Sequence, residues 1–150
     1  MVTWGDFAAA APDLSVAGRG LIYRTDTGEV LLATVREDEP PRIHPIYVAI
    51  VGERLYAFIL RGPKRVDLER DGRYAMHTHQ DPAAPSEFSV RGRARLVTDA
   101  TERDAVAQAW YFEADATYAL FEFSIDAAVL GARATADDWP PQYLSWAAPR

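Results

Sequence analysis

The sequence feature that most restricts the fold is a two-residue connection, Gly52-Glu53, between segments rich in β-branched and aromatic residues. The two segments, 43–51 and 55–60, each have the length of one strand. So short a connection joins antiparallel neighbours, because parallel strands need a crossover of a dozen or more residues. Gly52 can take the positive φ angle that a type II′ turn requires at its first position. The sequence therefore predicts a central antiparallel hairpin.

Further β-prone segments lie on both sides of this hairpin. They cover residues 30–35 before it and residues 74–79, 87–97 and 119–125 after it, and polar or proline-rich turns separate them. Closing six antiparallel strands into a barrel removes the exposed edges that an open sheet would offer. We expect a mainly β fold, a six-stranded antiparallel barrel with short flanking helices.

Helical signals occur at three places. Residues 1–28 hold apolar side chains three or four positions apart, and Pro12 divides this helical segment in two. A proline at the first position starts a helix over 63–70. Asp99 and Glu102 have the spacing of a capping box before a helix that reaches about residue 110.

The chain has no internal repeat and no composition break, so we expect one domain. Its helical segment covers about 1–28, its barrel about 30–133, and an aromatic, proline-interrupted tail about 134–150 docks on the rest. A composition of 49% hydrophobic and 25% charged residues is typical of soluble globular proteins.

Composition also excludes several kinds of site. The chain has no cysteine, which excludes thiol nucleophiles, thiolate metal ligands and disulfides. Its net charge of −6 argues against nucleic acid or anionic lipid as a partner. No apolar run approaches the roughly 20 residues of a membrane helix, and no secretory signal is evident. We expect a cytoplasmic protein without membrane contact.

Two motifs favour an ordinary interpretation over a functional one. His77 and His79, followed by Asp81, resemble part of a dinuclear metal site, but the only other histidine lies upstream. We therefore expect no metal. Arg91, Arg93 and Arg95 alternate along one strand and suit either a solvated face or, less well given the net charge, RNA.

The most informative segment is 61–70, where Arg61, Lys64 and Arg65 surround the first turn of the predicted helix. A phosphate is held well by cations together with the free N–H groups of a helix start. A flat ring attached to that phosphate would lie along the preceding strand and along residues 42–46. The alternative is a solvated basic surface.

The order of these segments resembles the FMN-binding split-barrel superfamily, the pyridoxamine 5′-phosphate oxidase-like group with its deazaflavin-dependent relatives. The resemblance covers about residues 30–97. The segments that carry it are 32–36 (LATVR), 41–46 (PRIHPI), 55–58 (LYAF) and 63–75 (PKRVDLERDGRYA).

The resemblance implies a homodimer of two six-stranded split barrels with a cofactor at the subunit interface. The cofactor would be FMN or, alternatively, the deazaflavin coenzyme F-420. Carried over residue by residue, the ring would lie beside Arg42, Ile43, His44 and Pro45, and the ribityl-phosphate end beside Ile59, Leu60, Arg61, Lys64 and Arg65. His44 is the one candidate acid or base.

Two features of the sequence depart from the family pattern, one residue and one missing motif. Gly62 stands where relatives often have serine, which removes one hydroxyl donor to phosphate, and the tail lacks the Trp-x-Arg signature of genuine pyridoxamine phosphate oxidases.

The resemblance implies a flavin- or deazaflavin-dependent oxidoreductase that transfers hydride to or from an unidentified small molecule. The competing interpretations are a non-catalytic FMN or haem carrier of the same fold and an RNA-binding barrel.

Overall fold

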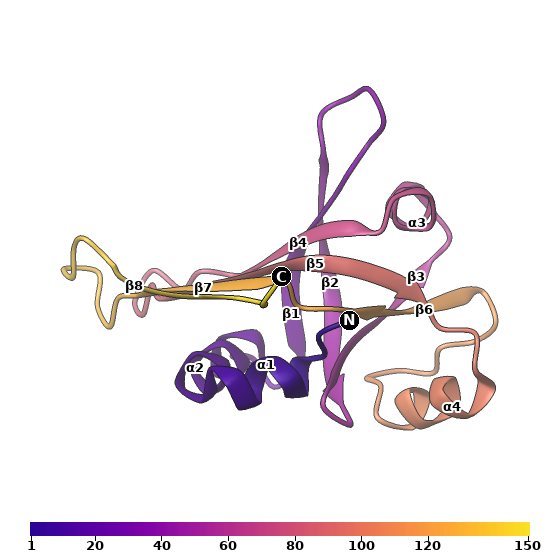
Figure 1. The fold of residues 1–150 in the computed structure, drawn as a ribbon, viewed down its shortest axis with the longest axis horizontal. Helices are drawn as coiled ribbons and strands as arrows, with labels where there is room; N and C mark the ends of the chain where they lie inside the picture. Colours follow the sequence, from indigo (N-terminus) through magenta and orange to yellow (C-terminus); the bar gives the residue numbers. More distant parts are fainter.

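The computed structural model describes residues 1–150 and contains six strands that close into an antiparallel barrel (Figure 1). Around the barrel they run in the order β4, β1, β2, β3, β6, β5, and the pairing of β5 with β4 closes the ring. This confirms the predicted fold class. The strands are β1 (Gly28–Thr34), β2 (Arg42–Val51), β3 (Arg54–Leu60), β4 (Arg73–Thr78), β5 (Glu87–Leu96) and β6 (Tyr118–Phe123).

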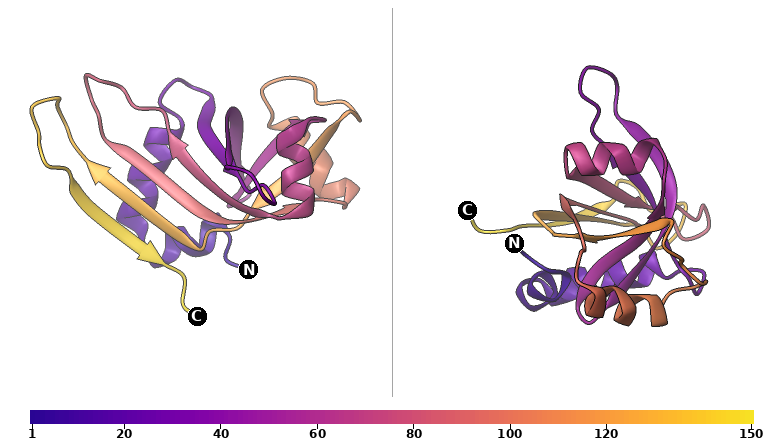
Figure 2. Two further views of the ribbon diagram at one scale, coloured as in Figure 1. Left: turned by 90° about the horizontal axis from the view of Figure 1, so that it is seen from above. Right: turned by 90° about the vertical axis from the view of Figure 1, so that its right-hand side faces the viewer.

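Two strands that the sequence did not predict extend this sheet. They are β7 (Ala127–Ala132), which pairs with the first half of β5, and β8 (Gln142–Ala147), which pairs with β7 and carries the sheet beyond the barrel (Figure 2). The second half of β5 pairs with β6 instead. Gly92 lies where β5 changes partner, and a Cβ there would stand 2.0 Å from the carbonyl oxygen of Ser124.

Four short helices flank the sheet: α1 (Trp4–Ala10), α2 (Pro12–Ile22), α3 (Pro63–Arg70) and α4 (Ala100–Gln108). As predicted, Pro12 separates the first two. Helices α1 and α2 lie against the β5–β7–β8 part of the sheet (Figure 1), where the ring of Phe7 packs between Phe88 and Trp146 at centroid distances of 6.4 and 5.1 Å. The longest helix has 11 residues, and none has the length and apolarity to cross a bilayer.

The central hairpin is antiparallel as predicted, but its turn type is not the predicted one. Both turn residues have positive φ angles, +54° at Gly52 and +64° at Glu53, whereas a type II′ turn needs only the first. This pattern defines a type I′ turn, whose twist also matches that of the flanking strands. The carbonyl of Glu53 accepts a hydrogen bond of 2.8 Å from the N–H of Gly5, which ties the turn to α1.

The barrel is split between β2 and β3. These strands pair only where residues 49–51 face residues 54–56, next to the hairpin turn. Farther from the turn, β2 pairs with β1 alone and β3 with β6 alone. Two aromatic rings of the loop after α4 contact these strands. The ring centroid of Trp110 lies 5.3 Å from that of Phe58 on β3, and the ring centroid of Tyr111 lies 5.6 Å from that of Tyr47 on β2.

Candidate functional site

Helix α3 is tied to β2 by the hydrogen bond from Arg42 to Asp67, and it carries Lys64, whose positive charge acts on His44 of β2. Gly62 occupies the N-cap position of this helix, and glycine has no side chain to accept a hydrogen bond. The N–H groups of the first turn therefore have no side-chain acceptor. Lys64 is the only lysine in the chain, and no carboxylate lies within ion-pair distance of it. The first turn of α3 therefore offers an uncompensated positive charge together with free backbone donors.

His44 has an imidazole nitrogen, Nε2, that is buried and has no hydrogen-bond partner. Burial lowers the pKa of His44 below its ordinary value, the positive charges of Lys64 and Arg42 lower it further, and Asp67 opposes them. The imidazole is therefore neutral near pH 7. A neutral imidazole with an unpartnered nitrogen can exchange a proton or ligate a metal ion.

Asp67 connects these residues to the barrel, a role that could not be predicted from the sequence. Its side chain is 2% exposed, and its Oδ2 accepts hydrogen bonds from the hydroxyl of Thr34 at 2.8 Å and from Nε of Arg42 at 2.9 Å. The carboxylate thus fixes both α3 and the Arg42 guanidinium against β1. An acidic residue inside a basic, surface-like helix pattern carries no sequence signal that it will be buried.

Four of the other residues predicted to bind the coenzyme are exposed on the surface of the chain. Ile43 and Leu60 are exposed at 67% and 49%, and Pro45 and Arg61 also lie on the surface. The side chain of Ile59 is buried in the core.

Arg65 is engaged elsewhere. Its Nε donates to Glu69 at 3.0 Å and its Nη1 to the carbonyl of Thr117 at 3.2 Å. The charges of Arg42 and Lys64 thus both act on His44. Ile43, between Arg42 and His44 in β2, projects from the opposite, exposed face of the strand.

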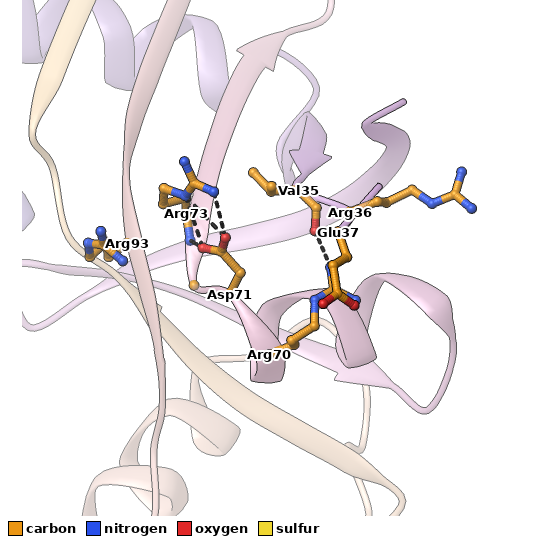
Figure 3. Close-up of a pocket in the computed structure, with 8 residues that line it drawn as sticks. Val35, Arg36, Glu37, Arg70, Asp71, Arg73 and Arg93 are labelled. Atoms are coloured by element: carbon orange, nitrogen blue, oxygen red, sulfur yellow. Dashed lines mark hydrogen bonds and ion pairs between the residues drawn. The ribbon is translucent and has the colours of Figure 1, made fainter. Parts of the chain in front are cut away.

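In the single chain these residues form an open surface rather than a closed pocket. None of the five principal hollows is lined by any of the nine predicted residues. The largest, about 580 Å³, lies at the opposite end of α3, near Arg70 and Asp71 (Figure 3).

The remaining motifs have structural partners. Nε2 of His77 lies 3.4 Å from a carboxylate oxygen of Glu87, and no group of three histidine or acidic side chains is placed to hold a metal ion. Arg95 is held by the buried carboxylate of Glu122 and by Glu102, so it does not form a free stripe with its neighbours.

No protein-family model matches the chain, and no curated protein sequence does either. Solved structures do. A Clostridium acetobutylicum protein related to general stress protein 26, of the pyridoxinephosphate oxidase family, has a TM-score of 0.65 at 11% identity, over 88% of this chain and 92% of that chain. The haem storage protein HutZ from Vibrio cholerae has a TM-score of 0.60 at 16% identity, over 75% and 89%.

A haem-binding protein from Mycobacterium smegmatis has a TM-score of 0.60 at 15% identity, over 85% of this chain, and this chain spans 57% of that protein's length. Similarity at such low identity establishes the fold. Together with the closed six-stranded barrel split between β2 and β3, it shows that the chain has the split-barrel fold of the pyridoxamine 5′-phosphate oxidase-like proteins.

Proposed function

We propose that the protein binds FMN, or alternatively the deazaflavin coenzyme F-420, and acts as an oxidoreductase on a small molecule. The observation that carries this proposal is the single lysine in the first turn of α3, where no side chain caps the helix and where its positive charge acts on His44 with its unpartnered Nε2. A coenzyme phosphate fits there, because a cation and free helix N–H groups both stabilise it. Arg61, exposed and without an ion pair, supplies a second cation at the same end.

The ring of the coenzyme would lie along β2. Over residues 42–47 this strand has no strand partner on the side facing β3, and at Val48 the carbonyl accepts a hydrogen bond of 2.6 Å from the hydroxyl of Tyr111. The backbone groups that face β3 over 42–47 are therefore the ones available to a ligand. Because the single chain leaves this surface open, we propose that a second copy covers it. Three large apolar side chains, Ile43, Leu60 and Val66, are exposed at β2, β3 and α3 and suit such an interface.

When bound, such a coenzyme supplies hydride transfer at its ring. The protein's residues then bind and orient it: Lys64 and Arg61 hold the phosphate end, and Asp67 keeps Arg42 fixed beside the strand. His44, neutral near pH 7, can hold or release a proton at Nε2 beside the ring.

A second candidate function is haem binding without turnover. It is favoured by the same unpartnered Nε2 of His44, because a neutral imidazole is a common haem iron ligand and nearby cations can pair with propionate groups. Two of the similar structures are named as haem-binding or haem storage proteins.

The absorption spectrum of gently purified protein tests both functions, followed by titration of the apoprotein with FMN, F-420 and haem. The proposal expects saturable binding of FMN or F-420, and reoxidation of the reduced coenzyme by a substrate. Binding of haem alone, with a spectrum altered by His44→Ala, supports the carrier instead. Failure of all three ligands to bind rejects both functions.

A further inference from the structure

The largest of the five principal hollows has arginine at half of its eight lining positions, although the chain as a whole is acidic. It lies between the C-terminal end of α3, the start of β4 and the loop that follows β1, with β5 on its far side (Figure 3). Four arginines and two carboxylates line this space of about 580 Å³. Its lining residues are Val35, Arg36, Glu37, Arg70, Asp71, Gly72, Arg73 and Arg93.

The backbone holds two of these arginines opposite each other. Arg73 of β4 and Arg93 of β5 are direct partners in the antiparallel ladder, an arrangement in which like charges repel. The carbonyl of Gly72 accepts a hydrogen bond of 2.7 Å from Ala94, and a Cβ on Gly72 would lie 2.5 Å from the carbonyl oxygen of Ala94. The floor of the hollow is therefore fixed.

Most of the guanidinium donors in this hollow are unused. Arg73 directs Nε and Nη2 to Asp71 (Figure 3). Nη2 of Arg70 donates to the carbonyl of Val35 at 2.6 Å and lies 3.6 Å from Oδ1 of Asp67. The side chain of Arg93 makes no hydrogen bond or ion pair. A guanidinium carries five N–H donors, so Nη1 of Arg73, Nη1 and Nε of Arg70 and the whole of Arg93 remain free.

Arg36 does not contribute to this set. Its guanidinium is paired with Glu39 and points away from Arg73 and Arg93 (Figure 3). The functional part of the hollow is therefore the trio Arg70, Arg73 and Arg93.

We propose that this trio binds a small anion with two or more negative charges, of the pyrophosphate class. Guanidinium groups match phosphate oxygens in paired hydrogen bonds, and such an anion would relieve the repulsion between Arg73 and Arg93. The volume lies within the range of small-molecule sites. The site is separate from the proposed coenzyme site, because the two lie at opposite ends of α3.

Isothermal titration of the full chain with inorganic pyrophosphate in low-salt buffer tests this proposal. We expect Arg93→Gln to weaken binding at least fivefold. Arg91→Gln is the matched control, because Arg91 is exposed on the same face of β5 two residues away and does not line the hollow. Equal affinity in both variants and the wild type overturns the site, and so does an equal loss in both variants.

Two further variants separate this site from the coenzyme site. Lys64→Ala is expected to leave pyrophosphate binding within twofold of wild type, whatever it does to coenzyme binding. Asp71→Asn removes a repelling carboxylate from the hollow and is expected to tighten pyrophosphate binding. If Lys64→Ala abolishes pyrophosphate binding while Arg93→Gln does not, the anion binds at α3's first turn and the present proposal is wrong.

Discussion

At the scale of single residues, the proposed coenzyme site makes its most specific prediction for Lys64. Replacing it with alanine should weaken binding of FMN or F-420 by about 1.5–3 kcal/mol, because one charge-assisted hydrogen bond to phosphate is lost. Fluorescence titration of the apoprotein measures this change. Arg91→Ala, which removes an exposed cation of β5 that is not among the residues proposed to hold the coenzyme, should leave the affinity unchanged. Unaltered affinity in Lys64→Ala would move the phosphate site elsewhere.

His44 should make stability depend on pH. Its pKa in the folded protein lies below the ordinary value of 6.5 because of burial and the nearby cations. As pH falls through about 6.5, the unfolded chain therefore takes up a proton that the folded chain does not, and the free energy of unfolding decreases.

The variant His44→Asn should lose that part of the pH dependence. Urea unfolding of both proteins at pH 7.5 and pH 5.5 measures the change in the free energy of unfolding between the two pH values. The contributions of His77 and His79 to this change cancel in the comparison, because both proteins retain these residues. Equal decreases in the two proteins would contradict the depressed pKa of His44.

The family resemblance assigned Arg42 and His44 to the ring of the coenzyme and Lys64 to its phosphate end, and in the structure the charges of Arg42 and Lys64 both act on His44. The sequence could not identify Asp67, whose burial depends on contacts with Thr34 and Arg42 from other strands. It also could not show that Arg65 turns to Glu69 and the carbonyl of Thr117, since side-chain partners across loops are set by packing.

At the scale of elements, the turn of the central hairpin requires a left-handed backbone conformation at both of its residues. Gly52 has a φ angle of +54° and open space where a Cβ would project. Gly52→Ala should therefore lower the free energy of unfolding by about 1 kcal/mol through backbone strain alone.

Gly20 is the matched control for this hairpin prediction. It also has open space around it, but it lies within α2, where alanine is the better helix former. Gly20→Ala should raise the free energy of unfolding by up to about 1 kcal/mol, measured by urea denaturation of both variants. Changes of the same sign in the two variants would contradict this account.

Elements with a strong local signal could be predicted, and elements that depend on distant partners could not. The strands on both sides of Gly52-Glu53 and the helix that starts at Pro63 follow from turn chemistry and proline geometry. Strands β7 and β8 were missed, because their short, small or proline-flanked segments become strands only beside β5 and beside each other.

At the scale of the whole molecule, we expect two copies to associate through the surface around Ile43. A charged residue there would be desolvated on association, so Ile43→Asp should shift the protein from dimer to monomer at micromolar concentration. Sedimentation velocity measures this shift. Val16→Asp is the control, because Val16 is exposed at 72% but lies on α2. A monomeric wild type, or the same behaviour in both variants, would contradict the proposed interface.

The antiparallel barrel and the basic start of α3 could be predicted from the order of residues, because turn residues, proline positions and alternating side chains act locally along the chain. Where the barrel splits, how Asp67 holds Arg42, and the position of Arg73 opposite Arg93 beside a hollow became visible only in the folded chain. The contact of Asp67 with Arg42 and the pairing of Arg73 with Arg93 join separate elements, and the barrel splits because β2 and β3 continue beside different partners, β1 and β6.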